Sequence, residues 1–65
     1  MKYAVYETSY NGNTEWFSAP VSSVQLNSNG QKIEEDGAVT SKYSKDFNTS
    51  REAEDYCFDC ITGNY

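Results

Sequence analysis

The C-terminal segment constrains the fold most, because it carries the signals of a helix at both of its ends. Thr49 followed by Glu52 fits the S/T-x-x-E capping box, and Ser50 is an alternative N-cap. Gly63 is typical of the residue that ends a helix in the left-handed conformation. Acidic side chains in the first turns lie near the positive end of the helix dipole and favour the start. The sequence therefore predicts one helix between Thr49 and Gly63.

One face of this helix is apolar. At about 100° per residue, the apolar side chains gather in a stripe: Ala53, Tyr56, Cys57, Cys60 and Ile61. These are the only residues that can anchor the helix to a sheet, so we expect this stripe to be buried. Phe47 precedes the cap and is placed to pack against Ala53 or Tyr56, much as a hydrophobic staple does.

Two strands joined by a tight turn are predicted at the N-terminus. Lys2–Tyr10 is rich in Tyr, Val and Thr, which favour strands. Asn11-Gly12-Asn13 is a hairpin-turn signal, and Thr14–Ala19 is the returning strand. Pro20 then ends this strand or lies on a sheet edge.

The register of this hairpin stays open. A two-residue turn at Asn11-Gly12 puts Tyr6 beside Phe17. A three-residue turn puts Tyr6 and Thr8 on the face of Trp16 instead, because a slip of one residue exchanges the two faces.

The middle of the chain is predicted to form short strands and turns, and the order of the elements indicates the fold class. Val21–Leu26 alternates weakly, and Gln31–Ile33 is a short returning strand after the turn at Asn27–Gly30. After an acidic turn, Ala38–Tyr43 is the last strand. Strands first and a helix last predict an α+β fold. We expect a small antiparallel sheet of three to four strands with one C-terminal amphipathic helix packed on it, as a single domain over residues 1–65.

Composition limits both the core and the partners. A chain of 65 residues buries only about 60% of its unfolded surface. Aliphatic residues are scarce, so the six Tyr, three Phe and one Trp must do most of the packing. Ten acidic residues against five basic ones argue against direct nucleic-acid binding. The same charge permits a basic protein partner, including one that normally holds nucleic acid.

Neither a membrane span nor a signal peptide is indicated. No apolar run approaches the roughly 20 residues of a span. The N-terminal stretch MKYAVYETSY lacks the apolar segment of a signal peptide. We therefore expect a soluble cytoplasmic protein with no membrane partner.

The two cysteines form a Cys57-x-x-Cys60 pair, which we interpret as structural. Free cysteine commonly behaves as a small buried hydrophobe. A reactive pair usually has its first thiol at a helix N-terminus, whereas Cys57 lies about two turns in, beside Asp55 and Asp59. A zinc site needs four ligands, and the chain has two Cys and no His. We expect no metal and no cofactor, and a thiol-active or metal-binding accessory protein is kept as an alternative.

Catalytic constellations are missing from the sequence. Without histidine, neither a Ser-His pair nor a Cys-His pair can form. There is no phosphate-binding glycine loop. The sequence therefore predicts a protein that is not an enzyme.

Phe58 does not fit the buried stripe. It projects nearly opposite Cys57 and Cys60, among carboxylates, in the anchor-and-rim pattern of an interface. The alternative is that Phe58 folds under the preceding loop or under Tyr65. For the interface, the candidate partner-binding residues are the anchor Phe58, the rim residues Glu54, Asp55 and Asp59, and Trp16, with Tyr6 as a second exposed sheet aromatic.

The run KDFNTSREAEDYCFDCITG, Lys45–Gly63, resembles a pattern of small phage-encoded proteins. In these, a last strand leads through an aromatic residue, a cap and a Glu-rich first turn into one amphipathic helix. Phage anti-CRISPR inhibitors include small α+β proteins of this kind. The resemblance implies a compact inhibitor that occupies the surface of a host enzyme or defence complex, and it carries over no binding residue. A nucleic-acid mimic that binds a basic groove is the alternative from another class.

Overall fold

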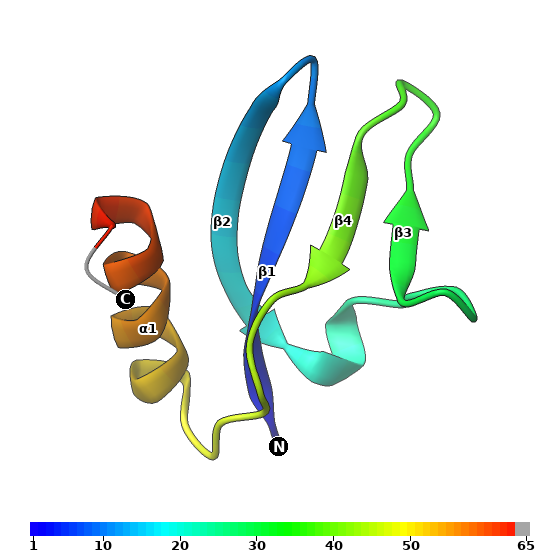
Figure 1. Ribbon diagram of the computed structural model, residues 1–65. Coiled ribbons are helices and arrows are strands. Elements are labelled where there is room, and N and C mark those ends of the chain that lie inside the picture. Colours follow the sequence, from blue (N-terminus) through cyan, green and yellow to red (C-terminus); the bar gives the residue numbers. More distant parts are fainter. Residues whose placement is uncertain (64–65) are drawn as a thin grey trace.

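The computed structural model describes residues 1–63 and shows a four-stranded antiparallel sheet with one α-helix beside it (Figure 1). The strands lie in the order β2-β1-β4-β3. The elements are β1 (Tyr3–Tyr10), β2 (Asn13–Pro20), the short 3₁₀ helix η1 (Val21–Ser23), β3 (Gln31–Ile33), β4 (Val39–Lys42) and α1 (Ser50–Thr62). The predicted α+β fold with a C-terminal helix is confirmed.

The β1–β2 hairpin adopts the two-residue turn. Tyr6 pairs with Phe17, and their rings stack with centroids 5.5 Å apart. Asn11 and Gly12 both have positive φ, 50° and 81°, as a type I′ turn requires. This register also determines which side chains lie on the other face of the sheet. Trp16 pairs with Glu7, and both side chains point to the side opposite Tyr6 and Phe17.

The helix covers the face of the sheet that carries Trp16. The Tyr43 ring lies 6.3 Å from the Trp16 ring and 6.4 Å from the ring of Tyr56 in α1. Trp16 is therefore half-buried on the covered side rather than an exposed sheet aromatic. The expectation of an exposed Tyr6 is also wrong, since Tyr6 is 1% exposed on the opposite face. Burial raises the pKa of its phenol, with a smaller opposing effect from Lys42.

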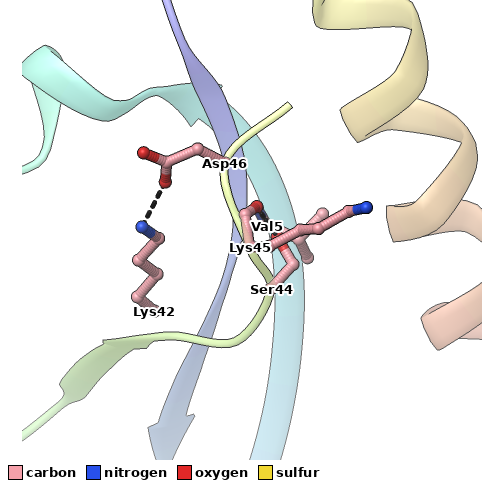
Figure 2. Close-up of polar contacts among 5 residues, drawn as sticks. All are labelled: Val5, Lys42, Ser44, Lys45 and Asp46. Atoms are coloured by element: carbon pink, nitrogen blue, oxygen red, sulfur yellow. Dashed lines mark hydrogen bonds and ion pairs between the residues drawn. The ribbon is translucent and has the colours of Figure 1, made fainter. Parts of the chain in front are cut away.

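A bulge between β4 and the helix returns the chain to this covered face (Figure 2). The β1–β4 ladder stops at the pair Tyr6–Lys42 and resumes at a single bridge, Tyr3–Phe47. Between these pairs β1 has residues 4–5 and the other strand has residues 43–46, so two residues are inserted. Inserting two residues, an even number, leaves the alternation of side chains between the two faces unchanged. Phe47 therefore lies on the same side of the sheet as its partner Tyr3.

Polar contacts stabilise the bulge. The Val5 carbonyl accepts hydrogen bonds from the N–H of Tyr43, at 2.8 Å, and of Ser44, at 3.2 Å. The Val5 N–H in turn donates to Ser44 Oγ at 2.8 Å, so the side chain replaces a missing ladder acceptor. Lys42 and Asp46 form an ion pair across the excursion (Figure 2). The predicted strand Ala38–Tyr43 therefore ends one residue early, at Lys42.

The weak alternation over residues 21–26 does not form a strand. The Val21 N–H donates to the Lys2 carbonyl at 2.8 Å, and the chain then turns into η1. Ser23 Oγ donates to the Pro20 carbonyl at 2.8 Å, and the Val24 N–H bonds the Val21 carbonyl at 3.4 Å. Serine side chains that bond nearby backbone in this way compete with strand pairing.

The outer edge of the sheet, at β3, is short and partly closed. The Asn27 N–H donates to the Gln31 carbonyl at 2.8 Å, and Asn27 Oδ1 accepts from the Gln31 N–H at 3.1 Å. The turn thereby occupies backbone groups of the first residue of the edge strand. Ile33, the last residue of β3, is 64% exposed.

Candidate interaction surface on the C-terminal helix

Both ends of α1 are fixed by the predicted residues. Thr49 is the N-cap, and its Oγ1 accepts a hydrogen bond from the Glu52 N–H at 3.2 Å. The same hydroxyl donates to Glu52 Oε1 at 3.1 Å. Gly63 is the C-cap in the left-handed conformation, with φ 80°, and its N–H donates to the Asp59 carbonyl. The prediction of a capped helix between Thr49 and Gly63 is confirmed.

The inner face of α1 buries its smallest side chains. Ala53, Cys57 and Cys60 are buried, and Tyr56 packs against Phe47 with ring centroids 5.6 Å apart. Both cysteines are free thiols, and their predicted burial is confirmed. Burial raises the pKa of both thiols, and for Cys60 the charges of Cys57, Asp59 and Glu7 raise it further. A buried thiol that resists ionisation is a poor nucleophile, so the pair fits the structural interpretation.

The outer face of α1 carries Phe58, which is 63% exposed. The carboxylates predicted to surround it, Glu54, Asp55 and Asp59, are exposed as well. The prediction that Phe58 points away from the sheet is confirmed. The alternative that the preceding loop covers Phe58 is wrong, and Tyr65 lies outside the described residues.

Ile61 corrects the predicted stripe. The sequence places it on the buried face, but its side chain is 59% exposed. The buried arc of the helix comprises Cys60, Ala53 and Cys57, with the half-buried Tyr56 at one edge, and Ile61 lies about 40° beyond Cys57 at the other edge on the helical projection. The contact between Tyr56 and Phe47 rotates the arc toward Tyr56, which leaves Ile61 at its outer edge. Phe58 and Ile61, three residues apart, therefore form one exposed apolar pair.

Charges near this pair are largely unpaired. Arg51 Nε lies 3.8 Å from Asp55 Oδ1, but both side chains are mostly exposed and such a pair contributes little. Within residues 1–63, neither Glu54 nor Asp59 has an ion-pair partner. The Thr62 hydroxyl is used internally, since it donates to the Phe58 carbonyl at 3.0 Å. The outer face thus presents an apolar pair beside free carboxylates.

The predicted site residues divide into two groups. Phe58, Glu54, Asp55 and Asp59 share the exposed part of α1. Trp16 lies apart from them, on the sheet face that α1 covers. Its Nε1 is buried and has no hydrogen-bond partner among the described residues. The structure therefore supplies Ile61, not Trp16, as the apolar neighbour of Phe58.

Residues 1–63 contain no pocket and no group of three or more His, Cys, Asp or Glu side chains placed to hold a metal ion. With 13 residues, α1 is too short to span a bilayer, and the described residues include no longer helix. Comparisons with protein-family models, with curated proteins and with solved structures return no match.

Proposed function

We propose that this chain is a small acidic protein-binding module without enzymatic activity. It acts as a phage-type inhibitor in the host cytoplasm and blocks an enzyme or a defence complex by occupying its surface. The observation that carries the proposal is the position of Phe58, 63% exposed and accompanied by three exposed carboxylates. Transferring such a ring into a partner's pocket gains about 1.5–3 kcal/mol from burial.

The charge and the thiols support this class over the alternatives. A net charge of −5 favours a basic partner surface, and free carboxylates beside Phe58 bring that charge to the contact. The absence of histidine from the sequence removes the usual general base of nucleophilic catalysis. Burial of Cys57 and Cys60, with raised pKa values, disfavours a thiol-active accessory protein.

The test is capture of a partner with matched variants. The immobilised chain is exposed to lysate of the host, and bound proteins are identified by mass spectrometry. Phe58→Ala removes the anchor, whereas Ile33→Ala removes an equally exposed apolar side chain, 64% against 63%, from the far edge of the sheet. We expect one protein to be retained by the wild type and by Ile33→Ala and lost with Phe58→Ala.

Charge variants separate this function from nucleic-acid mimicry. If the chain imitates phosphates, replacing Glu54, Asp55 and Asp59 with their amides abolishes capture and Phe58→Ala has little effect. Mimicry also weakens steeply as salt is added. Capture that is unchanged by substitution of Phe58 and of these carboxylates would contradict both hypotheses, the Phe58-anchored interface and nucleic-acid mimicry.

A further inference from the structure

We propose that the outer face of α1 docks into an apolar groove whose rim carries Lys or Arg side chains. This inference rests on the proposed function and specifies the chemistry of the partner. Its elements are the apolar pair Phe58 and Ile61 and the carboxylates of Glu54 and Asp59, all of which are exposed. Together they match the helix-in-groove mode of recognition.

The geometry gives the contact a direction along the helix. Glu54, Phe58 and Ile61 follow the i, i+4, i+7 spacing and lie within about 60° of one another on the helical projection. Phe58 and Ile61 are 63% and 59% exposed, so the ring of Phe58 and the branched side chain of Ile61 can both contact the floor of a groove. On the same projection Glu54 lies between Ile61 and Phe58, whereas Asp55 and Asp59 lie about 60° and 100° beyond Phe58, on the side away from Ile61. A groove that takes the apolar pair therefore meets one carboxylate between the two side chains and two carboxylates along one flank.

The carboxylates without a cationic partner indicate that the rim of the partner's groove is positively charged. Glu54 and Asp59 have no cationic partner within residues 1–63, and Arg51, the one cation on this helix, already lies 3.8 Å from Asp55. Desolvating these carboxylates against an apolar or acidic rim is costly, whereas Lys or Arg supplies charge-assisted hydrogen bonds.

Two other occupants fit less well. A second copy of the chain would bring an equally acidic outer face, with three carboxylates and one cation, to the contact, and like net charges across an interface are unfavourable. A lipid surface is matched by helices with Lys and Arg on the polar face, the reverse of this helix. A groove on another protein is therefore the occupant that best fits the outer face of α1.

Two synthetic helical peptides test the chemistry directly. One carries a leucine stripe flanked by lysines over about 14 residues, or four turns, and the other has glutamate in place of each lysine. Each is titrated into the ¹⁵N-labelled chain, and backbone amide shifts are followed. We expect saturable shifts confined to α1 with the lysine peptide and none with the glutamate peptide. Phe58→Ala and Ile61→Ala should each weaken this binding at least about tenfold, and Ile33→Ala should not.

The outcomes are distinct. Shifts on the sheet, equal binding of both peptides, or no saturable shift with the lysine peptide would overturn the proposed partner chemistry, an apolar surface edged by Lys or Arg. Concentration-dependent α1 shifts without peptide would assign the face to a second copy and also overturn it. A partner captured through Phe58 whose affinity survives Glu54→Lys and Asp59→Lys would retain the proposed function and remove the basic rim.

Discussion

The two faces of α1 differ in a way that runs against the simple expectation for a small domain. The inner face buries alanine and two cysteines, whereas the outer face exposes phenylalanine and isoleucine. Cys60 is 2% exposed and Phe58, two residues away, is 63% exposed. Small residues suffice inside because the aromatic rings of Trp16, Tyr43 and Phe47 fill the space between helix and sheet.

This difference separates residues that hold the fold from residues that the fold does not use. Burying a large apolar side chain stabilises a fold by about 1.5–3 kcal/mol, which is substantial for a marginally stable domain. Phe58 and Ile61 are mostly exposed, so the fold gains only a minor part of this stabilisation from them. The contrast predicts that substitutions on the two faces have opposite profiles: large effects on unfolding inside and large effects on binding outside.

Trp16→Ala should destabilise the fold most. Trp16 lies on the covered face and contacts Tyr43, which in turn contacts Tyr56 of α1. We expect the free energy of unfolding to fall by about 3 kcal/mol, the lower end for a core aromatic, because the ring is only half-buried. Urea denaturation followed by tryptophan-independent circular dichroism measures this. A loss below about 0.5 kcal/mol would show that Trp16 does not belong to the inner layer.

Cys60→Ser should have the next largest effect. The substitution puts a hydroxyl without a partner where a thiol is 2% exposed, and we expect a loss of about 1–3 kcal/mol in the free energy of unfolding. Cys60→Ala is the matched control, because it removes the sulfur without adding a hydroxyl. Serine as stable as wild type would place Cys60 in contact with water.

Thr49→Ala should weaken the start of the helix. It removes the acceptor of the Glu52 N–H, and we expect a loss of about 0.5–2 kcal/mol. Ser50→Ala is the control, since Ser50 is the first helical residue and not the cap. The urea midpoints of the two variants are compared. Equal shifts for Thr49→Ala and Ser50→Ala would show that Thr49 is not the N-cap.

Phe58→Ala and Ile61→Ala should change stability least. Both side chains are mostly exposed, and we expect the free energy of unfolding to stay within about 0.5 kcal/mol of the wild type. Loss of affinity for the captured partner, at least about 2 kcal/mol for Phe58→Ala, would then be an effect on the interface alone. Cooperative unfolding of Phe58→Ala at a much lower urea concentration would return Phe58 to the core.

The sequence predicts the parts of the fold that local chemistry determines. The cap at Thr49, the terminator Gly63 and the turn at Asn11-Gly12 are set by a few neighbouring residues, and all three are confirmed. The hairpin register needed the structure, because both turn lengths satisfy the local pattern. The bulge at Tyr43–Asp46 has no local signature, since it depends on Ser44 reaching Val5, 39 residues away.

The candidate site was predicted only in part for the same reason. Helical periodicity suffices to place Phe58 outside and Cys57 inside. It cannot fix the rotation of the buried arc to within one side chain, so the sequence pattern wrongly places Ile61 in the core. That rotation depends on the tertiary contact between Phe47 and Tyr56, at 5.6 Å. The sequence does not show that Trp16 lies on the covered face, because identifying that face requires the hairpin register.

The reaction rate of a third thiol tests most directly the claim that α1 turns its cysteines inward and Phe58 outward. The Phe58→Cys variant is treated with a thiol reagent at neutral pH, and adducts are counted by mass spectrometry over time, with a sample in concentrated urea as reference. The account predicts one fast thiol and two that react at least about 100-fold more slowly than in urea, an opening free energy of about 2.7 kcal/mol. Three thiols reacting at one rate, or protection at position 58, would contradict it.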